Sequence, residues 1–139
     1  MERIMGLDLG SRTLGIAVSD PLGMIARTVE TFRFDPDDYD AACSRAVQLA
    51  KELGAVKFVL GLPKHMNGDV GIRGQISLDF KAKLEAGSGL PVILQDERLT
   101  TAAAERILIS ADVSRKKRKA VIDQMAAVQI LQSYLDQKR

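Results

Sequence analysis

The sequence predicts an α/β fold in which helices cover both faces of a mixed five-stranded sheet. Three observations indicate this fold. Strand-like segments joined by short turns follow one another up to residue 34, as in an antiparallel meander. Two later apolar runs are short and continuous, which is typical of strands buried on both faces. Helix-like segments separate those runs, and helical crossovers connect parallel strands along a right-handed path.

The meander comes first in the chain. Residues 4–10 form an apolar strand pattern that carries a single carboxylate, Asp8, near its end. A tight turn leads to residues 13–20, which predict a second strand, and residues 24–34 predict a third. Because the connection before the third strand is short, these strands should pair antiparallel. The meander therefore places one acid at an accessible edge of the sheet.

A helix and a buried strand follow. Pro36 and the acids around it predict a helix start, and the helix should run to about residue 53. Gly54 is a natural C-terminal cap for this helix. Residues 57–61 predict the fourth strand, and a glycine-rich loop is expected over residues 62–74.

The second crossover completes the sheet. Ile76, Phe80 and Leu84 recur every four residues and mark one face of a second helix. Residues 91–95 are nearly all apolar and predict the fifth strand. The fourth and fifth strands should therefore lie parallel to the first.

The last part of the chain is predicted to be helical. Thr100 or Thr101 can cap a third helix that runs through about residue 110. Residues 115–119 are basic and are expected to form a connector. A final helix should end near residue 137.

Composition limits the class of protein. A chain of 139 residues with 46% hydrophobic content has the size of one domain, residues 1–139. The net charge of +2 gives no global case for nucleic-acid binding, so such binding must depend on local patches. One cysteine and one histidine exclude an internal disulfide and a zinc cluster. With no leader and no membrane-length apolar run, we expect a cytoplasmic protein without a membrane partner.

Acids gather at one predicted edge of the sheet. Asp8 lies near the carboxyl end of the first strand, and Asp96 and Glu97 follow the fifth. Ligands of open α/β sheets bind beyond the carboxyl ends of the strands. Each acid alone is explained as a turn or capping residue, whereas together they indicate a site. Adjacency in the sequence leaves open whether Asp96 or Glu97 belongs to it.

A third acid lies on the packing face of the last helix. At 100° per residue, Asp123 shares one line with Ala127, Ile130 and Tyr134, and Ala126 lies beside that line. The two alanines are small enough to let the helix approach the sheet closely. Asp123 therefore joins the acid cluster, unless it only offsets the helix dipole.

Three neighbouring carboxylates repel one another unless cations neutralise them. Oxygen-rich acid clusters suit Mg²⁺ or Mn²⁺. Two such ions can activate a water and stabilise the leaving oxygen in phosphodiester hydrolysis. We therefore expect Asp8 to bridge two ions, with Asp123 holding one side and Glu97 the other, and with Asp96 as the competitor for the role of Glu97.

Four motifs occur in order along the chain: residues 6–10 (GLDLG), 61–63 (GLP) with 67–68 (NG), 96–101 (DERLTT) and 123–127 (DQMAA). The first alone is unspecific, because sugar kinases and actin-like ATPases open similarly. Together they resemble the YqgF/RuvX family of the RNase H-like superfamily over nearly the whole chain. The resemblance implies an RNase H-like three-layer fold, with catalytic and metal-binding acids at Asp8, Glu97 and Asp123. It also implies a nuclease acting on the 5′ end of pre-16S ribosomal RNA, with related members described as Holliday junction resolvases.

Basic residues near the predicted site are candidates for contacts with nucleic acid. They are Arg12, Lys64, His65, Arg73, Arg98, Arg115, Lys116, Lys117 and Arg118. For His65, a solvated loop histidine is favoured over a general base. The basic run at 115–119 is either a solvated connector or a grip on the phosphate backbone. Only 4% of residues are aromatic, so recognition should depend on backbone and shape rather than on base stacking.

Three other functions stay open. The same chemistry could act on a four-way DNA junction, which needs two symmetric cuts and hence a homodimer. A nucleotide-binding module of actin or sugar-kinase type is disfavoured by length, since that fold places ATP between two lobes. A non-catalytic RNA-binding factor would keep the fold without turnover. The sequence leaves a monomer and a homodimer equally open.

Overall fold

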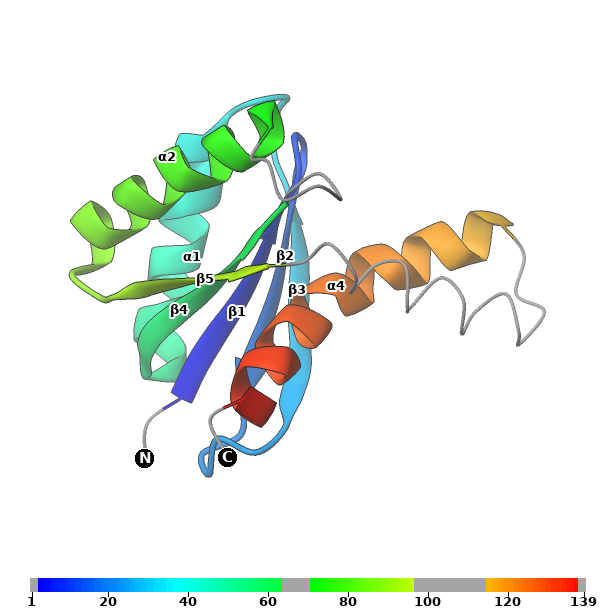
Figure 1. The fold of residues 1–139 in the computed structure, drawn as a ribbon. Coiled ribbons are helices and arrows are strands. Elements are labelled where there is room, and N and C mark those ends of the chain that lie inside the picture. Colours follow the sequence, from blue (N-terminus) through cyan, green and yellow to red (C-terminus); the bar gives the residue numbers. More distant parts are fainter. Residues whose placement is uncertain (1–2, 64–70, 97–114, 138–139) are drawn as a thin grey trace.

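A computed structural model describes residues 3–63, 71–96 and 115–137, with side chains of the last range described from residue 125 onward. Its centre is a five-stranded sheet in the order β3-β2-β1-β4-β5 (Figure 1). The strands are β1 (Arg3–Leu9), β2 (Thr13–Ser19), β3 (Ala26–Arg33), β4 (Ala55–Leu62) and β5 (Val92–Asp96). The described helices are α1 (Tyr39–Leu53), α2 (Ile72–Ser88) and α4 (Arg115–Gln137).

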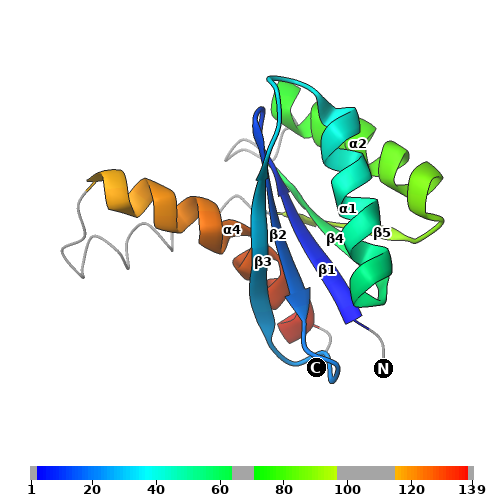
Figure 2. The same cartoon turned by 180° about the vertical axis from the view of Figure 1, so that it is seen from behind.

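The strand directions confirm the predicted mixed sheet. β1 pairs antiparallel with β2, and β2 pairs antiparallel with β3. β1 pairs parallel with β4, and β4 pairs parallel with β5. Helices α1 and α2 cover one face of the sheet and α4 covers the other, as the two opposite views show (Figures 1 and 2). The fold has the three layers that the sequence predicts.

The face beneath α1 and α2 holds the larger core. Side chains of a strand alternate between faces, and Met5, Leu7 and Leu9 all point into this layer. Phe80 and Leu84 of α2 are buried against them, which confirms the predicted face of that helix. This layer fixes β1 in the middle of the sheet.

The α4 face depends on a glycine of β1. A Cβ atom at Gly6 would lie 2.6 Å from Cβ of Leu131 and 3.0 Å from the carbonyl oxygen of Ala127. The absence of a side chain at Gly6 therefore lets α4 lie directly on β1. Ala127, Ile130 and Tyr134 are buried in this second core, which confirms the described part of the predicted stripe.

Two polar contacts fix the direction of α4 across the sheet. Gln132 accepts a hydrogen bond from the backbone N–H of Ala26 at 2.8 Å, at the start of β3. The Nζ of Lys57 donates to the hydroxyl of Tyr134 at 3.3 Å, near the start of β4. Both contacts are made by the C-terminal part of α4 and lie at the amino end of β1. The N-terminal part of α4 therefore runs toward the carboxyl end of β1.

The basic run 115–119 was predicted to be a connector, but it forms the start of α4. Lysine and arginine are good helix formers, and neither glycine nor proline occurs between residues 115 and 137. The helix therefore continues without a break through the basic segment. None of the described helices has the length and apolar character needed to cross a membrane.

Other element boundaries differ by a few residues. Asp38 caps α1, accepting from the N–H of Ala41 at 3.3 Å, so Pro36 precedes the helix. Gly54 caps the end of α1 in a left-handed conformation, as predicted. The connection after β4 is shorter than the predicted loop 62–74, because β4 reaches Leu62 and α2 starts at Ile72. The helix predicted from Thr100 or Thr101 lies outside the described residues.

Candidate active site

Asp8 lies at the carboxyl end of β1 on the face that α4 covers. Gly6 faces α4, and residues two apart on a strand point the same way, so Asp8 does too. Strand pairing defines what we name the Gly6 row: Thr28, Ala17, Gly6, Val59 and Ile93. This row is largely apolar, and the second core packs on it. Asp8, which is half-buried, lies two residues beyond it.

The next row on the same face differs in character. Asp8 pairs with Gly15 of β2, and the pairing of Leu7 with Leu60 puts Gly61 of β4 level with Asp8. Continuing outward gives the Asp8 row: Thr31, Gly15, Asp8, Gly61 and Gln95. Directly paired residues point to the same face. Neither neighbouring strand therefore places a side chain directly opposite Asp8.

The carboxyl ends of β1, β4 and β5 meet at one edge of the sheet, as predicted. Leu62 pairs with Asp96, which ends β5. Val92 and Leu94 face the larger core and Ile93 faces the α4 side. By this alternation Asp96, which is exposed, belongs to the α1/α2 face and Asp8 to the other. The backbone thus separates Asp8 from Asp96, although the sequence left Asp96 open as a partner.

The other two predicted acids are described in part or not at all. Asp123 precedes Ala127 by one turn of α4, and the carbonyl oxygen of Ala127 lies beside Gly6. Because α4 runs toward the carboxyl end of β1 in that direction, Asp123 is displaced from Ala127 toward Asp8. Glu97 is outside the described residues. Within the described residues, no three side chains of His, Cys, Asp or Glu gather as a metal site.

The predicted basic residues have different surroundings. Arg12 is exposed in the turn between β1 and β2, at the same edge as Asp8. Arg73 is half-buried, and its Nη2 donates to the carbonyl oxygen of Leu9 at 3.2 Å. The backbones of residues 115–118 form the first turn of α4. Lys64, His65 and Arg98 lie outside the described residues.

Contacts that the sequence did not reveal hold the β1–β2 turn. The N–H of Phe34 donates to the carbonyl of Arg12, and the N–H of Asp37 donates to the carbonyl of Ser11, both at 2.9 Å. Asp37 has a positive φ of 62°. These partners are far apart in the sequence, so no local pattern indicates them. The segment after β3 thus supports the strand end that carries Asp8.

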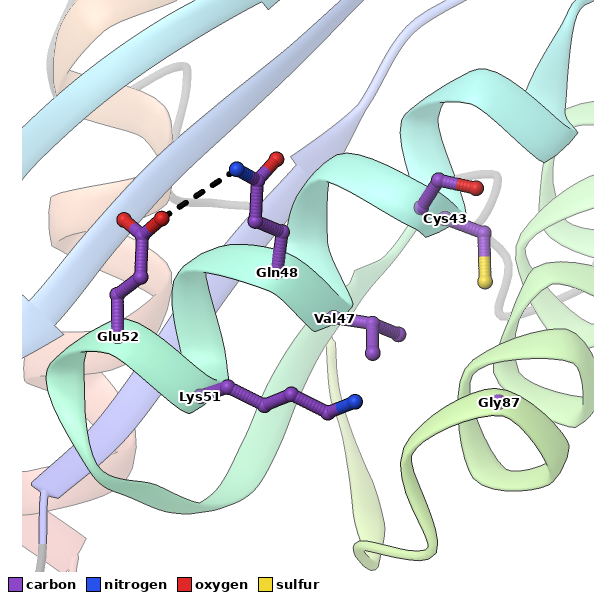
Figure 3. A pocket seen from close by; sticks show the side chains of 7 residues that line it. Cys43, Val47, Gln48, Lys51, Glu52 and Gly87 are labelled. Atoms are coloured by element: carbon purple, nitrogen blue, oxygen red, sulfur yellow. Dashed lines mark hydrogen bonds between the residues drawn. The ribbon is translucent and has the colours of Figure 1, made fainter.

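An open pocket lies away from this edge, between α1 and α2. Its volume is about 500 Å³, and Figure 3 shows Cys43 and Val47 of α1 beside Gly87 of α2. Burial raises the pKa of the Cys43 thiol, which favours its protonated form. The pocket is on the opposite face of the sheet from Asp8.

Comparison with solved structures defines the class of fold. The chain is similar to Thermus thermophilus RuvC in complex with a Holliday junction substrate, with a TM-score of 0.62 and 12% identity over 99% of this chain and 96% of that one. It is also similar to the fowlpox virus Holliday junction resolvase, with a TM-score of 0.58 and 15% identity over 99% of both chains. The fold is therefore the RNase H-like fold of these resolvases.

Sequence comparison defines the family. A family model described as "RuvX: Holliday junction resolvase" matches residues 2–137, so the chain belongs to the RuvX family. It is 58% identical to a Listeria monocytogenes protein over 96% of this chain and 97% of the relative. It is 55% identical to a Bacillus subtilis protein with the same coverage. Both relatives bear the name "Putative pre-16S rRNA nuclease".

Proposed function

We propose that this chain is a divalent-metal-dependent nuclease that processes the 5′ end of pre-16S ribosomal RNA. Membership of the RuvX family and the names of relatives at 55–58% identity support the activity and the substrate. The proposal places the protein in the cytoplasm, as the sequence predicts. The residues assigned to metal binding and catalysis are Asp8, Glu97 and Asp123.

The observation that carries the proposal is the position of Asp8 between Gly15 and Gly61. A carboxylate at the end of a central strand is costly unless partners or cations compensate it. Because both directly opposite positions are glycine, neither neighbouring strand has a side chain directly opposite this carboxylate. We propose that the backbone of a polymeric substrate comes close to the sheet at these glycines. A carboxylate that only caps a turn has no need of this arrangement.

The same geometry supports the choice of the two other acids. Asp96 belongs to the face opposite to Asp8, so of the two neighbouring acids that the sequence left open we choose Glu97. Asp123 is one turn from Ala127 in the direction of the Asp8 edge. All three donors are carboxylate oxygens, which suit Mg²⁺ or Mn²⁺ rather than zinc. When bound, such ions supply an activated water and stabilise the leaving oxygen.

Basic groups around the edge are proposed to contact substrate phosphates. Arg12 is exposed in the turn that follows β1. The first turn of α4 carries a dense positive charge, Arg115 to Arg118, on the helix that carries Asp123. Phosphate contacts of this kind give affinity and orientation with little sequence reading. Lys64, His65 and Arg98 are further candidates on the sequence alone.

A cleavage assay with two neighbouring acids tests this assignment. Wild type, Glu97→Gln and Asp96→Asn are incubated with a 5′-end pre-16S RNA fragment in Mn²⁺ or Mg²⁺, with a chelator as control. We expect Glu97→Gln to lose most cleavage and Asp96→Asn to retain it, because Asp96 lies on the face of the sheet opposite to Asp8. Cleavage by wild type in chelator, or equal loss in both variants, would contradict the assignment.

Holliday junction resolution is a second candidate, since the matching family model carries that description. The same assay with a synthetic four-way DNA junction separates the two substrates. Paired symmetric cuts made by a dimer would favour the junction, whereas cleavage of the RNA alone by a monomer favours the proposal. Light scattering during size-exclusion chromatography gives the oligomeric state. A third possibility, RNA binding without turnover, predicts neither Mn²⁺ binding nor cleavage.

A further inference from the structure

Arg73, a candidate for phosphate binding on sequence grounds, is engaged with the protein itself. It lies in the first turn of α2 and is half-buried. Its Nη2 donates to the carbonyl oxygen of Leu9 at 3.2 Å, and its Nη1 donates to the hydroxyl of Tyr39 at 3.3 Å. Both terminal nitrogens are thus used within the fold. Leu9 directly follows Asp8, so one of these bonds acts on the strand end that carries the proposed metal ligand.

The second bond of Arg73 leads back to the same strand end. The Tyr39 hydroxyl donates to Oδ1 of Asp37 at 3.0 Å. The backbone N–H of Asp37 donates to the carbonyl of Ser11 at 2.9 Å. Arg73, Tyr39 and Asp37 therefore form a chain of hydrogen bonds that begins at Leu9 and ends at Ser11. This chain, which we name the Arg73 clamp, closes around the first residues after Asp8.

The clamp lies where the sheet stops supporting β1. The register between β1 and β4 ends with Leu7 opposite Leu60, and the pairing with β2 ends with Leu9 opposite Leu14. The carbonyl of Leu9 lies beyond the β4 pairing, and a guanidinium donor satisfies it instead. Charged donors make stronger hydrogen bonds than neutral ones. Arg73 thereby replaces a neighbouring strand at the point where the backbone leaves the sheet.

We propose that Arg73 is a positioning residue that fixes the carboxyl end of β1, and with it the carboxylate of Asp8, through Leu9 and Tyr39. This inference rests on the proposed function, in which Asp8 holds the metal ions. It assigns Arg73 to the geometry of the site rather than to the binding of substrate phosphate.

Kinetics with three variants test the proposal. We expect Arg73→Met to lower kcat about 10- to 100-fold and to raise the Mn²⁺ concentration for half-maximal activity, as loss of outer supports does at metal sites. KM and the salt dependence of binding should not change. Tyr39→Phe should act in the same direction but less, because it keeps the bond to Leu9. Arg27→Met, an exposed arginine at the amino end of β3, is the matched control.

The opposite pattern would overturn the proposal. If Arg73 binds phosphate, Arg73→Met raises KM and lowers the slope of log affinity against log salt by about 0.7 to 0.9. Arg73→Lys sharpens the distinction. A lysine keeps one charge for a phosphate but lacks the planar fork that spans Leu9 and Tyr39, so it should not restore kcat. Full restoration by lysine would count against positioning.

Amide hydrogen exchange separates this inference from the proposed function. The N–H of Gly10 is bonded to the carbonyl of Thr13 at 2.7 Å within the clamped turn. In Arg73→Met, without substrate, this amide should exchange faster while the free energy of unfolding changes little. Unchanged exchange overturns the inference even if the nuclease activity is established. Faster exchange supports the clamp even if no cleavage is found.

Discussion

Gly6 decides how close α4 can come to β1. A methyl group there would meet Leu131 Cβ at 2.6 Å and the Ala127 carbonyl at 3.0 Å, and neither atom is the flexible end of a side chain. We expect Gly6→Ala to lower the free energy of unfolding by about 1–3 kcal/mol, the usual cost of overpacking. Urea unfolding of the purified variant measures this.

Gly87→Ala is the matched control, because its new Cβ would meet Val47 and Cys43 at ordinary contact distances of 3.6 and 3.9 Å. This glycine lies near the end of α2, where alanine is favoured by up to about 1 kcal/mol. The two glycine substitutions should therefore change stability in opposite directions. A loss of similar size in both would show that α4 does not depend on Gly6.

The ion pair between Glu30 and Arg45 should make stability depend on acid pH. Arg45 donates through Nη2 and Nε to the two carboxylate oxygens at 2.6 and 2.9 Å and holds the pKa of Glu30 below its ordinary value of 4.5. A carboxyl whose pKa is lower in the folded state stabilises the fold above its unfolded pKa. That contribution is lost as the pH falls through the folded value.

Glu30→Gln tests this dependence. Both side chains are nearly a third exposed, 28% and 29%, so we expect a contribution below about 1 kcal/mol. Thermal unfolding of wild type and variant should differ near neutral pH, and the difference should shrink as the pH falls below 4.5. A difference that is constant across this range would contradict the account of the pair.

The two halves of helix α4 have different roles. Its C-terminal half packs on the Gly6 row through Ala127, Ile130 and Tyr134. Its N-terminal half carries Asp123 and the basic residues of the first turns, and in Figure 1 this half extends past the sheet. Packing of the C-terminal half thus anchors the helix that carries these charged residues.

This division of α4 predicts a salt effect on RNA binding. Replacing Lys116 and Lys117 together with alanine should weaken binding and lower the slope of log affinity against log salt by about 1 to 2. Lys51→Ala removes a lysine from the exposed surface of α1 as the control. Fluorescence anisotropy at several salt concentrations measures the slope. An unchanged slope in the double variant would mean that the first turns of α4 do not touch phosphates.

The sequence predicted the elements whose signals are local. The strand patterns, the Gly54 cap, the face of α2 and the described part of the Asp123 line were correct. The prediction of a connector at the basic run was wrong. It was based on the density of charge, although lysine and arginine also favour a helix. The bonds of Arg73 to Leu9 and Tyr39 join residues 64 and 34 positions apart, so no periodicity could indicate them.

The Asp8 row could be predicted from the sequence only in part. Gly15 and Gly61 are visible in the sequence, but their place on either side of Asp8 depends on strand register. Register is set by pairing across the whole sheet and is not read from one segment. The exclusion of Asp96 from the face of Asp8 has the same origin.

At the scale of the molecule, the proposed function divides the two faces of the sheet between stability and chemistry. The larger core and the pocket between α1 and α2 lie on one side. The Asp8 row lies on the other side, just beyond the area that α4 covers. Substitutions around Cys43 should therefore affect stability more than cleavage, whereas substitutions along the Asp8 row should do the reverse.

The most direct test of the account is single-turnover cleavage of a 5′-end pre-16S RNA fragment in Mn²⁺ by Asp8→Asn. The control is Asp79→Asn, an exposed acid on α2. We expect Asp8→Asn to lose about 100-fold or more in rate, since it removes a direct metal ligand and not merely an outer support. Its unfolding transition should stay close to wild type. Undiminished cleavage by folded Asp8→Asn would contradict the central claim that this carboxylate holds the catalytic metal ions.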